Sequence, residues 1–393
     1  MSKLEELINE LCPNGVEFVD LGSICQSTYN IKWGEQDSDF QYIDLTSVDR
    51  VEHRIIETTT IDASSAPSRA QQIVQVDDVI FATTRPTLQR FCSIPKEFDG
   101  QICSTGFCIL RPITNKITPH YIYHIISTTD FQTYVEAMQK GASYPAITGK
   151  EVKLFRIPLP PLPVQEEIVR ILDNFTELTA ELTAELTARK QQYQYYSTLL
   201  FDHAKTNGVS SIKEVCYIEK GKTPIQKAIP GEYPMVVTTT ERKSCDSYQF
   251  DAKAVCIPLV SSRGHGVASL NHVYYQEGKF ALGNILCALI IKNETEVLSK
   301  YLYYYFEQTK DYTLVPLMKG GANVALHMND IEKLKIPLPP LAEQQRIVDI
   351  LDRFDTLCND ISNGLPAEIK ARQHQYEYYR DKLLTFPRVE LEV

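Results

Sequence analysis

The chain has 393 residues, of which 43% are apolar and 23% charged, and its formal net charge is −10. This length accommodates two or three domains, and the composition is that of an ordinary globular protein. The acidic balance excludes a protein that binds nucleic acid over its whole surface, so any DNA contact has to be a local patch.

The remaining global features exclude membrane and secreted proteins. No apolar stretch approaches the ~20 residues that a membrane span needs, and the N-terminal segment lacks the pattern of a signal peptide. The ten cysteines show no CxxC pair and no zinc-type spacing, which fits reduced thiols. We therefore expect a cytoplasmic protein without a membrane segment.

The first part of the chain reads as a mixed α/β domain. Apolar residues at helical spacing predict a short amphipathic helix within residues 1–20. Short strands between turns follow, the best at 72–76, 79–83 and 107–110. Thr118 before Pro119 is typical of a helix start, and we expect this helix to run to about Met138.

A long helix closes this half. Pro160, Pro161 and Pro163 predict an extended segment followed by a helix. From Ile168 to Leu200, apolar and long side chains then recur in steps of three and four residues, which is the pattern of a coiled-coil seam.

The chain then repeats itself. IPLPPLPVQEEIVRILDNF at 157–175 returns 179 positions later as IPLPPLAEQQRIVDILDRF at 336–354, and the RxxxYxYY ends match at 189–196 and 372–379. The second copy is four residues longer between these parts, so the seam is preserved. Asn363-Gly364-Leu365-Pro366 interrupts it, and we expect a kink or short break there.

The second half also repeats the order of the first, with strands expected at 255–260 and 285–291 and a helix from near Ser299. The divergent parts are 26–105 and 217–280. The fold class is α/β (mixed α+β), with two similar globular domains joined by two long antiparallel α-helices that form a coiled coil. The expected divisions are 1–156 (recognition domain 1), 157–205 (helical spacer 1), 206–335 (recognition domain 2) and 336–393 (helical spacer 2 and tail).

A tandem tetrapeptide, Thr-Ala-Glu-Leu at 179–182 and 183–186, lies in the first long helix. One such unit lengthens a helix by ~6 Å and turns it by ~40°. One DNA base pair rises ~3.4 Å and rotates ~35°. A helix that separates two DNA readers could thus be retuned in base-pair steps; an ordinary solvated coiled coil is the alternative.

With these features the chain resembles the specificity subunits of type I restriction-modification enzymes. The resemblance rests on the doubled IPLPPLxxQxxIVxILDxF segment, the QYxYY helix ends and the two dissimilar inserts, and it covers essentially the whole chain. It implies two target-recognition domains, each reading one half of a split, asymmetric site in double-stranded DNA. It further implies that the helices bind two methyltransferase subunits, through which restriction and translocase subunits join.

The resemblance implies no catalysis by this chain: S-adenosylmethionine, ATP and magnesium are expected on the partner subunits only. The sequence agrees, because it contains neither a GxxxxGK[ST] phosphate loop nor an NPP[YF] methyltransferase motif. His265 and His327 have no ligand partners at metal spacing, and the paired acids Asp77-Asp78 read as turn residues. The alternatives are a silent recognition subunit and a coiled-coil adaptor that binds only protein.

Candidate DNA contacts lie in loops that gather basic and hydroxyl or amide side chains, the groups that bind phosphates and base edges. For each of these residues an ordinary solvated loop is the alternative. The candidates are Thr83, Thr84, Arg85, Gln89 and Arg90 in the first insert, and Lys220, Lys222, Thr223, Thr238, Arg242, Lys243, Ser261, Ser262, Arg263 and His265 in the second. Trp33 and Tyr42, like the tyrosines at 193–196 and 376–379, are interpreted as packing residues rather than DNA contacts.

Overall fold

The computed structural model describes residues 2–204, 208–239, 243–263, 266–360 and 362–389. The chain divides into two compact units. Unit 1 comprises Met1–Glu181 and Ile369–Val393, and unit 2 comprises Leu182–Glu368. Each unit therefore contains one globular domain together with parts of the long helices.

Unit 1 begins with helix α1 (Lys3–Leu11) and contains three small sheets. The two-stranded sheet pairs β1 (Glu17–Asp20) with β9 (Arg156–Leu159), the four-stranded sheet has the order β3-β2-β7-β4, and the three-stranded sheet the order β6-β5-β8. The strands are β2 (Phe40–Ile43), β3 (Thr59–Ile61), β4 (Ala70–Ile73), β5 (Val79–Ala82), β6 (Phe91–Ser93), β7 (Ile102–Ser104) and β8 (Phe107–Leu110). The other helices and 3-10 turns of the domain are η1 (Leu21–Ile24), η2 (Trp33–Glu35), η3 (Pro86–Leu88), η4 (Lys96–Phe98), α2 (Pro119–Ser127), α3 (Thr129–Met138) and α4 (Gly149–Lys153).

Unit 2 is built on the same plan. It has a two-stranded sheet β10-β19 and two four-stranded sheets, β11-β18-β15-β16 and β13-β12-β17-β14. The strands are β10 (Val209–Ser211), β11 (Cys216–Lys220), β12 (Tyr233–Val236), β13 (Lys243–Cys245), β14 (Phe250–Asp251), β15 (Ala254–Pro258), β16 (Tyr274–Gln276), β17 (Lys279–Leu282), β18 (Leu286–Ile291) and β19 (Lys335–Pro337). The domain's helices and 3-10 turns are α6 (Ile212–Val215), η5 (Ile225–Lys227), α7 (Ser299–Thr313), η6 (Val315–Leu317) and α8 (Met328–Glu332).

The two units correspond sheet by sheet. In both, the repeated IPL segment forms an antiparallel strand, β9 or β19, against the strand that opens the domain. In both, the second sheet contains one parallel pair among antiparallel ones, β2 with β7 and β12 with β17. The repeat in the sequence is thus a repeat of the scaffold, meaning the shared arrangement of strands and helices in the two units.

The expected helix from Thr118 to Met138 is wrong in one respect, since it is two helices, α2 and α3. The Thr118 hydroxyl caps α2 by accepting from the backbone N–H of Tyr121 at 3.3 Å, as predicted. Thr128 then interrupts the helix, because its hydroxyl donates to the Ile125 carbonyl at 2.7 Å and accepts from the Phe131 N–H at 3.2 Å. A threonine able to satisfy both helix ends outweighed the continuous apolar pattern.

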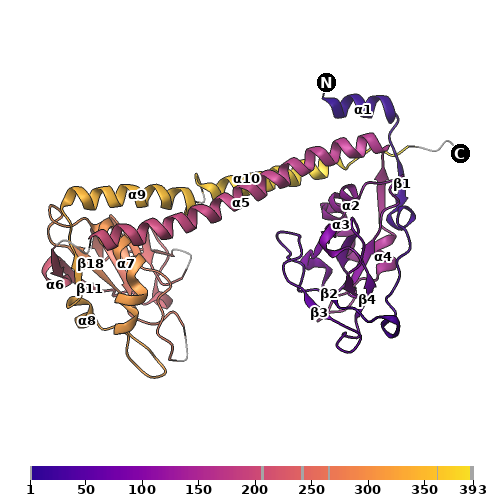
Figure 1. Cartoon of the computed structure of the whole chain (residues 1–393). Helices are drawn as coiled ribbons and strands as arrows, with labels where there is room; N and C mark the ends of the chain where they lie inside the picture. The colour runs from indigo at the N-terminus through magenta and orange to yellow at the C-terminus, as the bar shows by residue number, and fades with distance from the viewer. Residues whose placement is uncertain (1, 205–207, 240–242, 264–265, 361, 390–393) are drawn as a thin grey trace. The chain divides into compact units, whose positions relative to one another are not determined.

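The long helices are α5 (Leu162–Ala204), α9 (Leu341–Asn359) and α10 (Leu365–Leu383). The break between α9 and α10 confirms the interruption predicted at residues 363–366. In unit 1, α10 runs beside α5, and the Phe175 ring stacks on Tyr379 with centroids 5.5 Å apart (Figure 1). In unit 2, Phe354 of α9 stacks in the same way on Tyr196 at 6.2 Å.

A continuous apolar core joins each domain to its helices. In unit 1 it includes Val164, Ile168 and Leu172 of α5 together with Tyr121 of α2. In unit 2 it includes Phe201 and residues of α7 and α9. Among the described residues, no helix is long and apolar enough to cross a membrane.

The other strand predictions differ mainly at their ends. The segments expected at 72–76, 79–83, 255–260 and 285–291 are β4, β5, β15 and β18, and β8 matches 107–110. The last three of the four begin and end within two residues of their expected bounds, whereas β4 starts two residues early and ends three residues early, at Ile73. Trp33 donates from its indole N–H to the Ala70 carbonyl at 2.8 Å, and Tyr42 is buried, so both pack in the domain as interpreted.

Candidate nucleic-acid interface

The loop after β5 in unit 1 is held in an unusual backbone conformation. Arg85 and Gln89, at the two ends of the short η3 turn, both have left-handed backbone angles, with φ of 48° and 55°. Such angles are uncommon for residues other than glycine and are maintained only by surrounding contacts. Thr83 supplies one of these contacts, since its N–H and its hydroxyl both donate to the Gly106 carbonyl at 2.8 Å.

A second loop, residues 140–147, holds the first in place. It closes on itself through two backbone hydrogen bonds between Lys140 and Ala146. The N–H of Ile147 donates to the Thr83 carbonyl at 2.9 Å, and the N–H of Arg85 donates to the Pro145 carbonyl at 2.7 Å. The two loops therefore form one surface, although about 55 residues separate them in the chain.

This pairing brings together Arg85 and Tyr144. The Tyr144 side chain is 71% exposed, and the guanidinium carbon of Arg85 lies 4.6 Å from the centre of its ring. Arg90 is committed differently, since its guanidinium donates to the Val48 carbonyl. The Gln89 side-chain oxygen is buried and has no hydrogen-bond partner among the residues that the structure describes. Of the candidates in this loop, Arg85 is thus the best placed to meet a ligand.

Unit 2 has the same pair of loops. The N–H of Leu326 donates to the Leu259 carbonyl at 2.9 Å, and the N–H of Ser261 donates to the Val324 carbonyl at 3.0 Å. Lys319 and Ala325 close the second loop, as their counterparts do in unit 1. These bonds assign residues 259–261 to the place of residues 83–85.

The serines of this loop support its shape. The Ser261 hydroxyl donates to the Val267 carbonyl and accepts from the N–H groups of Arg263 and Ser269, both at 3.2 Å. Ser262 accepts from the Asn271 N–H at 3.0 Å. The Arg263 side chain is exposed and can reach a ligand. His265 lies outside the described residues, as does Arg242.

The other candidates in unit 2 lie beside β11, β12 and β13. Lys220 and Lys222 have exposed side chains, and their backbone is fixed because Gln249 accepts from the Lys222 N–H and donates to the Lys220 carbonyl, both at 2.9 Å. Thr223 donates from its N–H to the Leu282 carbonyl. Thr238 is half-buried and Lys243 is exposed. In unit 1, the remaining candidate Thr84 is also half-buried. For all of these residues, DNA contact remains a prediction.

The repeated glutamine of the PPLxxQ motif connects each domain to its helix, a role that sequence reasoning missed. In unit 1, Gln165 accepts from the Thr118 N–H at 3.1 Å and donates to the carbonyls of Lys116 and Pro160 at 2.9 and 2.8 Å. The counterpart Gln344 accepts from the Leu298 N–H at 2.9 Å and donates to the carbonyls of Glu296 and Pro339. Its repetition in the motif was the available signal.

An aspartate about two turns further along the helix makes a second connection. Asp173 in unit 1 accepts from His120 and His124, both at 2.8 Å. Burial raises the pKa of this carboxyl, but the two histidine hydrogen bonds outweigh burial and lower the pKa well below its usual range. The bond to Asp173 raises the pKa of His120, whereas burial lowers that of His124.

The counterpart aspartate in unit 2 has different partners. Asp352 accepts from the Lys300 ammonium at 2.7 Å and from the Tyr304 hydroxyl at 2.6 Å. Burial, and then this hydrogen bond, raise the pKa of Tyr304. The connection is thus repeated in position but not in chemistry.

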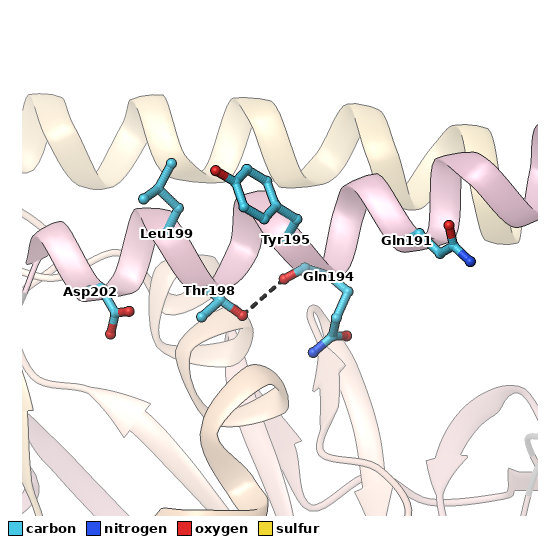
Figure 2. Close-up of a pocket in the computed structure, with 6 residues that line it drawn as sticks. All are labelled: Gln191, Gln194, Tyr195, Thr198, Leu199 and Asp202. Carbon is cyan, nitrogen blue, oxygen red and sulfur yellow. Dashed lines mark hydrogen bonds between the residues drawn. The ribbon is translucent and has the colours of Figure 1, made fainter.

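The QYxYY ends of the long helices present exposed tyrosines in each unit, of which Tyr195 and Tyr378 are the most exposed. Tyr195 is 65% exposed and Tyr378 is 61% exposed, while the neighbouring Tyr193 and Tyr376 are half-buried in the helix packing. Figure 2 shows Tyr195 and Leu199 on one side of α5, where they line an open hollow of about 520 Å³. The interpretation as packing residues therefore holds for Tyr193 and Tyr376, and for Tyr196 and Tyr379, whose rings stack on Phe354 and Phe175. It is wrong for Tyr195 and Tyr378.

No group of three or more histidine, cysteine, aspartate or glutamate side chains in the described part of the chain is arranged to hold a metal ion. The ten cysteines are free thiols.

Comparison with known proteins places the chain among DNA-specificity proteins. The family described as "Type I restriction modification DNA specificity domain" matches residues 13–189 and again 205–371. A protein of Haemophilus influenzae named as a type I restriction enzyme specificity subunit is 34% identical over 69% of this chain and 73% of its own length. The specificity subunit of the Escherichia coli EcoR124I/EcoR124II enzyme is 34% identical over 70% and 73%. A solved structure from work on complex assembly and conformational transition of the type I restriction-modification system has 26% identity and a TM-score of 0.63, covering 97% of this chain and all of that one.

Proposed function

The chain belongs to the family of type I restriction-modification DNA specificity proteins, and from this premise we propose that it selects the DNA sequence on which its partner subunits act. The family match spans both halves of the chain, which favours this function over an adaptor that binds only protein.

The observation that carries the proposal is that the two units share one backbone arrangement but present different side chains on their paired loops. The same backbone hydrogen bonds join the paired loops in both units. The side chains that these loops present differ, with Arg85 in unit 1 where unit 2 has Ser261. A frame that is kept while its contact residues change suits two readers of two different half-sites in a split, asymmetric DNA sequence.

The helices supply the spacing between the half-sites in this proposal. Helix α5 continues from Leu162 to Ala204 without a break, through both Thr-Ala-Glu-Leu units. Because a continuous helix transmits length and rotation along its axis, one added unit shifts one end by ~6 Å and ~40°. The recognised gap is then expected to change with the number of units.

The exposed tyrosines support docking of two methyltransferase subunits. Tyr195 and Tyr378 are equivalent positions of the repeat, one in each unit, and large exposed aromatic side chains are favoured anchors of protein interfaces. Two copies of a surface suit two copies of a partner. In this proposal the restriction subunits join through the methyltransferases, and S-adenosylmethionine, ATP and magnesium bind to those partners, so that this chain has no catalytic role and acts in the cytoplasm, where its DNA is.

Docking is tested with Tyr195→Ala, Tyr378→Ala and the double variant. Each single change is expected to weaken or abolish the binding of one methyltransferase subunit, and the double change the binding of both. Native mass spectrometry of the assembled complex measures how many subunits are bound. Tyr312→Ala is the control, because Tyr312 is 58% exposed, close to the other two tyrosines, but lies on α7. Unchanged stoichiometry in the double variant would exclude this surface.

The main experiment is long-read mapping of N6-methyladenine in host genomes with and without the gene. We expect a split, asymmetric motif that disappears when the gene is deleted. The two parts of that motif would give both half-sites and their gap. An unchanged methylome would contradict an active specificity role and leave a silent subunit or an adaptor.

A further inference from the structure

Corresponding positions of the two paired-loop surfaces carry different side chains. The matching hydrogen bonds make Ser261 of unit 2 the equivalent of Arg85 of unit 1. The 179-residue offset, which relates Ala146 to Ala325, makes Asn323 the equivalent of Tyr144. An arginine on an aromatic ring in one domain thus corresponds to a serine and an asparagine in the other.

Arg85 forms no ion pair with any residue that the structure describes. Within the described residues, no carboxylate lies within 4.0 Å of its guanidinium. Arg111 shows the contrasting case, because Asp78 accepts two hydrogen bonds from it at 2.8 Å in the domain interior. An exposed arginine without an acidic partner retains its hydrogen-bond donors for a ligand.

The surroundings of Arg85 also hold it in place. Its N–H is bonded to the Pro145 carbonyl, and its own carbonyl accepts from the Leu88 N–H at 3.0 Å. These bonds stabilise the left-handed backbone angle at Arg85. With its central carbon 4.6 Å from the centre of the Tyr144 ring, the guanidinium loses less freedom on binding.

We propose that Arg85 is the guanine-reading residue of the first recognition domain and that Tyr144 is its positioning residue. Arginine donates two parallel hydrogen bonds to O6 and N7 of guanine in the major groove, which is the commonest base-specific contact in DNA recognition. The first half-site then contains a G·C pair that Arg85 reads. This inference rests on the proposed DNA-specificity function and assigns it one base contact.

The second domain has a serine at the position of Arg85, so other residues have to read its half-site. Ser261, in the place of Arg85, uses its hydroxyl within its own loop. The two half-sites therefore respond separately to changes in the two loop pairs.

The test uses Arg85→Gln, Tyr144→Phe and Tyr144→Ala in the full chain, assembled with its methyltransferase partners. Methylomes and competition binding with oligonucleotides that vary each base of the site are the readouts. Lys96→Gln is the control, because it removes one exposed positive charge from the same domain. Asn323→Ala controls for changes in the other domain.

Arg85→Gln is expected to abolish the preference for guanine at one position of the first half-site, lowering discrimination there by roughly tenfold to a hundredfold. The second half-site stays unchanged, which also shows that the variant is folded. Tyr144→Phe retains the preference because the ring remains. Tyr144→Ala weakens the preference at the same position by a smaller factor, and Lys96→Gln changes no position.

Two results would overturn the proposal. One is an unchanged motif in Arg85→Gln. The other is an equal loss of binding on every oligonucleotide, which is the behaviour of a phosphate contact. Both leave the proposed function intact, since that function fails only if no motif depends on the gene.

Discussion

Asp173 in unit 1 and Asp352 in unit 2 occupy the same place in the repeat, yet they bind different side chains. Two histidines donate to the first, and a lysine and a tyrosine to the second. About two helix turns earlier, Gln165 and Gln344 make the same three hydrogen bonds in both units. The comparison separates two kinds of repeated contact, one that binds backbone atoms and one that binds side chains.

The physical reason for the difference lies in the partners. The glutamine binds a backbone N–H and two carbonyls, which any sequence presents when the fold is kept. The aspartate needs particular donors, and any donor of suitable reach satisfies it. Backbone-directed contacts therefore persist between the copies while side-chain pairs diverge.

The largest expected effect tests the shared contact. Gln165→Leu and Gln344→Leu each leave one N–H and two carbonyls without a side-chain partner in a place where the glutamine is fully buried. We expect each change to destabilise its own unit by about 2–4 kcal/mol, and by similar amounts in the two units. Native-state hydrogen exchange of α2 and α7 measures the two units separately. Very different losses would show that the two contacts are not equivalent.

An intermediate effect is expected where the units differ. Tyr304→Phe removes the hydroxyl that donates to Asp352 and leaves Lys300 in place. Because a hydrogen bond to a charged group is lost where the Asp352 carboxylate is partly exposed to solvent, we expect the free energy of unfolding of unit 2 to fall by about 1–2 kcal/mol. Exchange of α7 amides measures it, and α2 of unit 1 is the internal control. A loss that also appears in α2 would contradict a contact confined to unit 2.

The smallest effect depends on pH. The pKa of His120 is raised above its ordinary value of 6.5 by its bond to Asp173, so its contribution is present below that ordinary value and is lost as pH rises through the raised pKa. His120→Asn should therefore destabilise unit 1 at about pH 5.5 and much less at about pH 8.5. The loss stays below about 1 kcal/mol because the imidazole is largely exposed.

The neighbouring groups must be controlled in this experiment. His124, whose pKa is lowered by burial, acts in the opposite direction, since its contribution is lost as pH falls. It is present in both the original chain and the variant, as are Asp77 and Arg380, so the difference between the two reports His120 together with its effect on His124, whose pKa the charge of His120 lowers. Lys300→Asn is the matched change in unit 2, where no imidazole occupies this place. An equal loss at both pH values in unit 1 would contradict the charge mechanism.

The sequence by itself determined the features that depend on near neighbours. The proline runs, the seam of apolar residues, the cap at Thr118 and the interruption near Gly364 all act within a few residues, so their spacing predicts the helices. The copy at 179 residues' distance predicted the two-fold plan, because equal segments fold alike. The buried strands β5 and β8 were also found from their continuous apolar runs.

Only the tertiary structure decided which residues meet across the chain. Arg85 and Tyr144 lie 59 positions apart, and no local pattern relates them; the backbone bonds between their loops do. The same holds for Arg90, a predicted DNA contact, because no local pattern relates it to the Val48 carbonyl to which its guanidinium donates. Loop side chains are free of periodic constraint, so their partners are set by the packing of the frame that carries them.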